Sequence, residues 1–301
     1  MPRARANGIE IEYDITGSDH GEPLLLIMGL GAQMTRWPQA FVDKLAARGL
    51  KVIRFDNRDV GLSTKLDAAG VPDMAAMFKT LSAGGKPDLP YSLDDMAADA
   101  AGLLEALGVE RAHIVGASLG GMVAQLVAAN HPERTLSLTS IMSTTGNRTL
   151  PPAAPAAVAV LNNRGPDPLV DFEGYVEHSI KGALVTGSPA YPADLDELRA
   201  RTRSDFQRSY SPQGFARQYA AAAASADRRP KLAGVTAPTL VIHGADDPLV
   251  PLAGGEDTAA HVPGAELKVI AGMGHDFPPA LYNTIVDAIL SVVERAKAGA
   301  V

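Results

Sequence analysis

The chain has 301 residues and a formal net charge of −7, with 46% hydrophobic and 20% charged residues. This composition is typical of a soluble globular enzyme, and the acidic balance argues against a protein that binds nucleic-acid phosphates. The absence of cysteine excludes disulfides, a cysteine nucleophile and zinc sites built on cysteine.

The first residues, "MPRARANGIEIEY", contain two arginines but no apolar segment of the kind found in a secretory signal. No run of about 18 apolar residues follows, which is the length that a membrane span requires. We therefore expect a cytoplasmic protein without a membrane segment.

The N-terminal pattern predicts a β-hairpin. Asn7-Gly8 is a typical type I′ turn sequence, and apolar residues alternate after it from Ile9 to Ile15. Later strands are short and almost continuously apolar, as in a parallel sheet that is covered on both faces. They are expected at residues 23–28, 51–55, 112–116, 136–141, 239–243 and 267–270.

Helical patterns lie between these strands, at residues 38–49, 92–108 and 279–297. The second of them begins with Ser92 and has Asp95 three residues later, which predicts a capping box. Alternation of strands and helices predicts an α/β fold with a mostly parallel sheet.

One long block interrupts the alternation. Residues 147–229 contain several helical patterns and no strand. We expect this block to form a helical cap over one edge of the sheet, inserted into a core domain made of residues 1–146 and 230–301.

The segment "HIVGASLGGM" places Ser118 between a predicted strand and a predicted helix. Such a sharp turn needs small neighbours, and Gly116, Gly120 and Gly121 meet that need. The pattern G-x-S-x-G in this context predicts a nucleophile elbow, which exposes the serine hydroxyl at the end of a strand. The alternative is a glycine-rich turn whose serine caps the helix.

A serine nucleophile needs a base, and the base needs an acid that orients it. Asp246 and Asp247 follow the strand at 239–243, and His275 follows the strand at 267–270. The chain order is therefore serine, aspartate, histidine, the order found in α/β hydrolases. We expect Ser118, His275 and one of the two aspartates to meet.

These motifs together resemble the α/β-hydrolase superfamily, and the resemblance covers nearly the whole chain. The branch that the chain resembles most contains the serine esterases related to aclacinomycin methylesterase, which have Met-Gly where many hydrolases have His-Gly. The resemblance implies an eight-stranded sheet with an antiparallel second strand, a helical cap after strand six, and hydrolysis without a cofactor or a metal. It is carried by "MGLG", "FDNRDVGLS", "GASLGG", "GADDPLVP" and "GMGH".

The resemblance also implies site residues. The backbone N–H groups of Leu30 and Leu119 are expected to form the oxyanion hole, and Asp247 is expected to be the acid because it directly precedes Pro248. A residue before proline is held in an extended conformation, in which Asp246 would point to the opposite side.

Gly29 and Trp37 are candidate lining residues of the substrate pocket, with packing as the alternative for Trp37. We interpret the other polar candidates as structural: His113 in the core, His243 behind the acid loop, Asp56 and Arg58 in a turn, and Tyr175 and His178 in the cap.

The sequence predicts a serine hydrolase that cleaves small to medium apolar carboxylic esters through an acyl-enzyme. Its expected partner is a small-molecule ester, with no nucleic acid and no membrane. A cofactor-free perhydrolase and a C–C bond hydrolase remain open, because both use the same three residues. A hydrolase-like protein that only binds a small molecule also remains open, since a fold does not fix a function.

Overall fold

The computed structural model describes residues 2–163 and 165–299 of the chain. Residues 1, 164, 300 and 301 lie outside the described residues. Residue 164 belongs to the predicted cap, 147–229, and the other three belong to the predicted core, 1–146 and 230–301. The described residues form one eight-stranded sheet in the order β1-β2-β4-β3-β5-β6-β7-β8. Its strands are β1 (Arg3–Ala6), β2 (Ile9–Thr16), β3 (Glu22–Ile27), β4 (Leu50–Phe55), β5 (Ala112–Ala117), β6 (Thr135–Ile141), β7 (Thr239–Gly244) and β8 (Glu266–Ile270).

The directions of the strands confirm the predicted α/β-hydrolase fold. β2 runs antiparallel to β1 and β4, and the remaining pairs are parallel. The predicted hairpin is present, because Asn7 and Gly8 both have the positive φ that a type I′ turn requires, at 46° and 80°.

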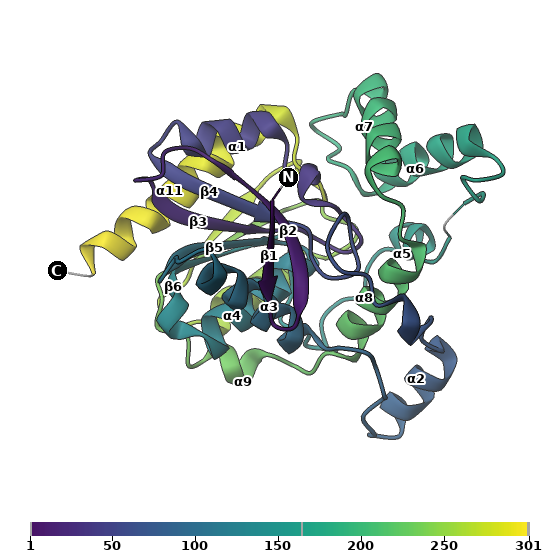
Figure 1. Ribbon diagram of the computed structural model, residues 1–301, viewed down its shortest axis with the longest axis horizontal. Helices are drawn as coiled ribbons and strands as arrows, with labels where there is room; N and C mark the ends of the chain where they lie inside the picture. The colour runs from purple at the N-terminus through teal and green to yellow at the C-terminus, as the bar shows by residue number, and fades with distance from the viewer. Residues whose placement is uncertain (1, 164, 300–301) are drawn as a thin grey trace.

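Helices cover both faces of the sheet (Figure 1). Along β3 the side chains alternate: Leu24 and Leu26 face one hydrophobic cluster, and Leu25 and Ile27 face the other. The first cluster includes α1 (Gln39–Ala46) and α11 (Tyr282–Ala298), and the second includes α3 (Leu93–Ala106) and α4 (Leu119–Asn130). Burial on both faces explains why the inner parallel strands are continuous apolar runs. The expectation was wrong for β8, which lies at the edge of the sheet and leaves Leu267 and Val269 exposed.

The start of α3 carries the predicted capping box. The Asp95 backbone N–H donates to Ser92 Oγ, and the Ser92 N–H donates to Asp95 Oδ2 at 2.8 Å. The helix α2 (Met74–Ser82) was not expected; it projects from the core beyond the loop that follows β4 (Figure 1).

Between β6 and β7 the described residues form helices only, as the sequence indicated. Four of them, α5 (Pro155–Asn162), α6 (Phe172–Thr186), α7 (Leu195–Arg208) and α8 (Pro212–Ala224), lie together beyond one edge of the sheet (Figure 1). The short α9 (Arg229–Leu232) leads back to the core, where α10 (Ala253–His261) follows β7. We call α5–α8 the cap helices.

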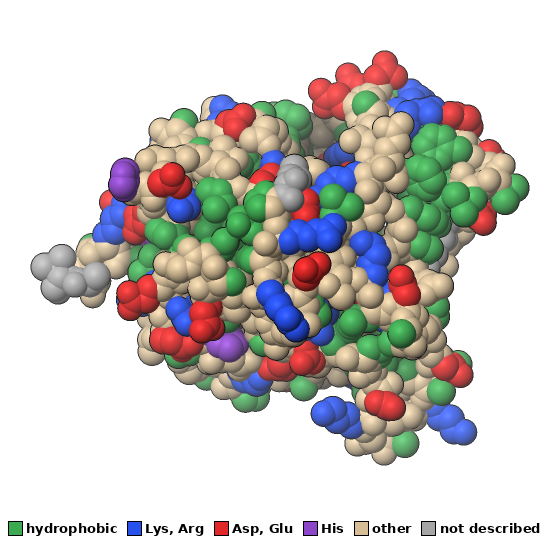
Figure 2. Space-filling model, in the orientation of Figure 1, with side chains coloured by type: hydrophobic (Ala, Val, Ile, Leu, Met, Phe, Trp, Pro, Cys, Tyr) green, Lys and Arg blue, Asp and Glu red, His purple; other side chains and the backbone are tan. Residues whose placement is uncertain are grey.

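The surface drawn in Figure 2 carries acidic and basic side chains interspersed, without a continuous field of one sign. Within the described part of the chain, no helix combines the length and the apolar character needed to cross a membrane.

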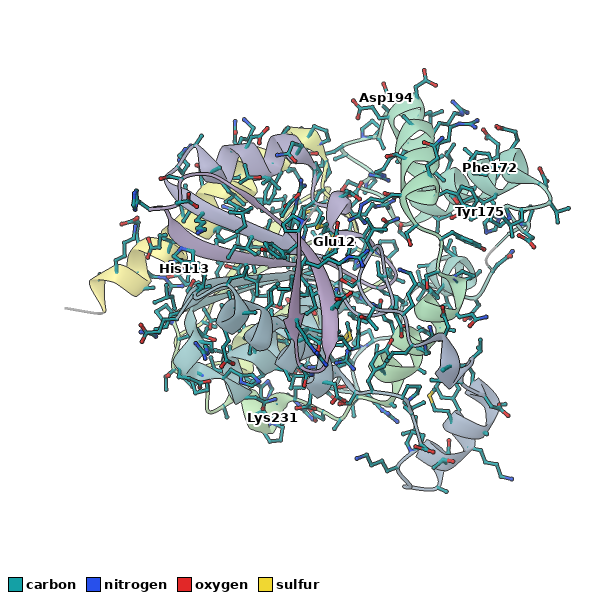
Figure 3. The ribbon with its side chains drawn as sticks, in the orientation of Figure 1. Glu12, His113, Phe172, Tyr175, Asp194 and Lys231 are labelled. Atoms are coloured by element: carbon teal, nitrogen blue, oxygen red, sulfur yellow. The ribbon has the colours of Figure 1, made fainter. Side chains whose placement is uncertain are left out.

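A buried histidine in the sheet makes the stability of this fold sensitive to acid. His113 on β5 is 1% exposed and lies away from the cap helices (Figure 3), with Nδ1 2.7 Å from Ser137 Oγ on the neighbouring strand. Burial lowers the pKa of His113, and this effect outweighs the opposing influence of the Glu22 carboxylate. The unfolded chain therefore binds a proton at a higher pH than the folded protein does.

We expect the free energy of unfolding to fall as the pH drops below about 6.5, the ordinary pKa of histidine, because protons then favour the unfolded chain. The substitution His113→Gln removes this group, so it should flatten the dependence between pH 7.5 and 5.5. Urea denaturation across this range measures the slope. The exposed His20→Gln variant serves as control, and equal slopes in the wild type and His113→Gln would contradict the assignment.

Candidate active site

Ser118 occupies a strained turn between β5 and α4. Its backbone has φ 56° and ψ −122°, in a region that residues other than glycine rarely adopt. The Ser118 N–H donates to the Ile141 carbonyl on β6 at 2.9 Å, and its own carbonyl accepts from Ser143 Oγ at 2.7 Å. Such strain persists only where the surrounding structure enforces it, and strained residues of this kind cluster at functional sites.

The glycines around Ser118 are required by close approaches of the backbone. A Cβ on Gly116 would lie 2.0 Å from the Gly120 carbonyl oxygen, and a Cβ on Gly120 would lie 2.0 Å from that of Ile27. A Cβ on Gly121 would lie 2.6 Å from Ser143 Cβ. The helix α4 can therefore start beside β5 and β3 only if these positions carry no side chain.

His275 and Asp247 complete a chain of hydrogen-bond contacts that begins at Ser118. His275 Nε2 lies 2.9 Å from Ser118 Oγ, and His275 Nδ1 lies 2.7 Å from Asp247 Oδ2. The three side chains come from loops after β5, β7 and β8. The fold thus brings together residues that are up to 157 positions apart in the sequence.

The two adjacent aspartates have different partners. Asp247 is buried, and its Oδ1 accepts the N–H groups of Leu249 and Val250 at 2.9 and 2.8 Å, which leaves Oδ2 for His275. Asp246 Oδ2 instead accepts the Gly272 N–H at 2.8 Å. The geometry therefore pairs His275 with Asp247, and Asp246 ties its own loop to the loop after β8.

His243 supports the Asp247 loop from behind. Its Nε2 lies 2.8 Å from the Val250 carbonyl oxygen and 3.7 Å from Asp247 Oδ2. Burial lowers the pKa of His243, so the ring is neutral at physiological pH and can donate to that carbonyl.

The two predicted oxyanion donors lie beside Ser118. Leu30 follows Gly29, whose added Cβ would lie only 3.1 Å from Ser118 Cβ, and Leu119 is the first residue of α4. Within residues 2–163 and 165–299, neither the Leu30 N–H nor the Leu119 N–H has a hydrogen-bond acceptor. Donors next to a nucleophile that are free of other partners can bind a negatively charged oxygen.

A cavity of about 1000 Å³ opens over Ser118 between the core and the cap helices. Ser118, His275, Gly29, Leu30 and Leu119 all line it. The cap contributes mostly apolar side chains, and its apolar lining includes Leu161, Leu198, Phe215, Tyr219 and Ala222.

Several charged lining residues escaped the sequence analysis. Arg36, Arg201 and Asp276 face the cavity, and burial raises the pKa of Asp276. Only Asp276 gave a local signal, since it follows His275 directly. Arg201 lies within an alternating run of charges on α7 that resembles an ordinary solvated helix face.

Other candidates occupy structural positions. Trp37 is fully buried, stacks on Phe41 and contacts Phe277, and it is not among the described residues that line the cavity. Tyr175 packs against Phe172 on α6 and against Phe206 on α7, within the cap helices (Figure 3). His178 Nε2 lies 2.9 Å from the Asn163 carbonyl oxygen.

The predicted turn after β4 is also structural. Asp56 accepts the N–H groups of Met34 and Leu62, each at 2.8 Å, and Arg58 forms a buried ion pair with Asp99. No group of three or more His, Asp or Glu side chains in the described ranges is arranged to hold a metal ion.

The matching family model, two sequence relatives and a solved structure all represent hydrolases. A model of the alpha/beta hydrolase fold matches residues 22–278. The chain is 30% identical to the rhodomycin D methylesterases of Streptomyces sp. strain C5 and of Streptomyces peucetius, in each case over 93% of both chains. Among solved structures, a meta-cleavage product hydrolase from Pseudomonas fluorescens IP01 superimposes with a TM-score of 0.74 at 21% identity, over 98% of both chains.

The close approach at Gly120 is directly testable. The substitution Gly120→Ala forces a methyl group against the Ile27 carbonyl, so we expect a loss of at least about 2 kcal/mol in the free energy of unfolding. Gly234→Ala is the control, because there an added Cβ meets only an ordinary contact at 3.5 Å in an exposed turn. Chemical denaturation measures both variants, and equal stabilities would show that the helix start can shift without cost.

Proposed function

Because this chain belongs to the alpha/beta hydrolase fold family, we propose that it is an enzyme that hydrolyses carboxylic esters with Ser118 as the nucleophile. One observation carries the proposal: His275 lies within hydrogen-bonding distance of both the Ser118 hydroxyl and the Asp247 carboxylate. The two methylesterase relatives support an ester as the substrate.

The proposed reaction follows from this geometry. His275 Nε2 removes the proton of Ser118 as its Oγ attacks the ester carbonyl, and the Leu30 and Leu119 N–H groups stabilise the oxyanion. The protonated imidazole then gives its proton to the leaving alcohol. Water attacks the acyl-enzyme in the same way and releases the acid, while Asp247 holds the ring in the orientation and tautomer that both steps need.

The cavity suggests the class of ester. At about 1000 Å³ it lies at the upper end of small-molecule sites, which span roughly 300–1,000 Å³. This volume has room for an acyl group at or above the upper end of the small to medium esters that the sequence predicts. We propose methyl or other small-alcohol esters of bulky, mainly apolar acids, a class consistent with the names of the methylesterase relatives.

We also propose that residues 147–229 act as the cap of this site, on a core of residues 1–146 and 230–301. Helices α5, α7 and α8 all contribute side chains to the cavity wall, so the shape of the substrate pocket depends on this block.

The proposed function predicts that the wild type hydrolyses methyl esters of bulky apolar acids and that Ser118→Ala does not. We expect the alanine variant to lose at least about 10³-fold in kcat, since the nucleophile acts as one unit with its base. Alcohol release across a panel of methyl esters measures the activity, and a fluorophosphonate probe should label the wild type but not Ser118→Ala.

The exposed Ser291→Ala variant on α11 is the matched control and should keep full activity. An inert wild type that binds the same esters without turnover would instead indicate a binding protein. Turnover confined to C–C cleavage substrates or to perhydrolysis would favour those alternatives.

The choice of acid predicts a second pair of variants. Asp247→Asn keeps the acceptor for Leu249 and Val250 but lets His275 take the wrong tautomer, a change that costs about 10⁴ in kcat in the well-studied serine proteases. Asp246→Asn keeps an acceptor for Gly272 and should cost less than about tenfold in kcat, because this side chain bonds to the loop after β8 and not to His275. Steady-state kinetics at neutral pH compares them, and a larger loss in Asp246→Asn would reverse the assignment.

A further inference from the structure

The loop that carries Leu30 is held from the side of the cap. We call residues 28–33, between β3 and the short helix at Met34–Arg36, the oxyanion loop. The Gly31 N–H, in the peptide unit directly after that of Leu30, donates to Gln218 Oε1 at 2.8 Å. Gln218 belongs to the cap helix α8, 187 positions away in the sequence.

Gln218 is a fully buried bridge between two loops. Its side chain is 0% exposed, and its Nε2 donates to the Arg58 carbonyl oxygen at 2.8 Å. Arg58 is itself fixed, because its guanidinium makes two hydrogen bonds of 2.6 Å to the Asp99 carboxylate on α3. The amide of Gln218 is therefore anchored at one end and holds the oxyanion loop with the other.

The helix that carries Gln218 has little freedom to move. Arg217, its neighbour, forms an ion pair with Asp59 in which both side chains are 0% exposed, with contacts of 2.7 and 2.8 Å. At Gly214 the helix comes so close that an added Cβ would lie 2.0 Å from the Asp59 carbonyl oxygen. Breaking such a buried pair is strongly unfavourable, so α8 is fixed to the core.

The oxyanion loop packs closely against α8. Gly31 has φ 63°, and a Cβ there would lie 2.5 Å from the Phe215 ring. Glycine at this position allows a backbone path that side chains oppose, but it constrains that path less than another residue would. Two hydrogen bonds flank the Leu30 N–H. The Gly29 carbonyl, in the same peptide unit, accepts the Ala32 N–H at 3.2 Å within the loop, and the next peptide unit is held from outside the loop by the Gly31–Gln218 bond.

We propose that Gln218 is a positioning residue for the oxyanion hole: by holding the Gly31 peptide it keeps the Leu30 N–H directed toward the space above Ser118. This inference rests on the proposed ester hydrolysis. It also means that α8 helps to orient an oxyanion donor, in addition to shaping the substrate pocket.

The test compares Gln218→Met with Gln213→Met, a substitution of the same type at an exposed position of α8. Gln218→Met leaves the Gly31 N–H without its acceptor, so we expect kcat on a methyl ester to fall by about 10- to 100-fold, somewhat less than for loss of a whole oxyanion donor. KM should change by less than about threefold, because the contact stabilises mainly the transition state. Gln213→Met should behave as the wild type.

The inhibition constant of a trifluoromethyl ketone is a second measurement, which a general loss of stability would not change. The ketone forms a tetrahedral adduct with the serine whose oxyanion occupies the same hole, so its inhibition constant should rise by the same factor as kcat falls. Thermal unfolding of each variant establishes that the compared proteins are folded. Unchanged kcat and ketone affinity in folded Gln218→Met would overturn the proposal, and so would a rise in KM alone.

Gln218→Glu is the second variant, because its carboxyl oxygen can still accept the Gly31 N–H and burial favours its neutral form. We expect its ketone affinity to stay within about tenfold of the wild type. A folded Gln218→Glu whose affinity for the ketone falls by more than about 100-fold would overturn the proposal. This result would count even if Gln218→Met does not fold. Failure of the proposed function is seen separately, as esterase activity that survives in Ser118→Ala.

Discussion

The backbone contact between β3, β5 and the start of α4 is the constraint on which the site depends. Gly116 and Gly120 allow carbonyl groups to lie where any side chain would stand, and this contact holds Ser118 at its positive φ. The strained turn directs the Ser118 hydroxyl toward His275 and places the Leu119 N–H beside it. A local steric requirement thus determines where the nucleophile, its base and one oxyanion donor can meet.

The features that the sequence predicted well are those set by neighbours in the chain. The hairpin at Asn7-Gly8, the capping box of α3 and the buried parallel strands depend on turn chemistry, capping and hydrophobic periodicity. The meeting of Ser118, Asp247 and His275 is a long-range contact, yet it was predictable because parallel strands end at the same edge of a sheet. Asp247 could be separated from Asp246 because the following Pro248 restricts the backbone.

Other features depend on side chains that meet only in the folded molecule. The bond between Gln218 and Gly31 and the ion pair between Arg208 and Asp56 join the cap to loops of the core, and nothing near either partner in the sequence indicates them. The size of the cavity has the same origin, since it is the space that remains when α5–α8 pack over the sheet. The residue composition of the cap reports side-chain volume and not the position of the helices, so it does not determine this size.

These long-range bonds change the physical meaning of the cap. The backbone N–H of His275 donates to the Thr186 carbonyl at the end of α6 at 2.7 Å. The loop of the proposed base is therefore also attached to a cap helix. On the other side of Ser118, Gln218 of α8 holds the oxyanion loop. A cap joined to the core at both of these points cannot swing away as a rigid unit without disturbing the base and the oxyanion donor. The C-terminal part of α7 is attached as well, because Arg208 pairs with Asp56 and Asp205 pairs with Arg36, each at 2.8 Å. Substrate entry that preserves the site must therefore leave all of these attachments in place.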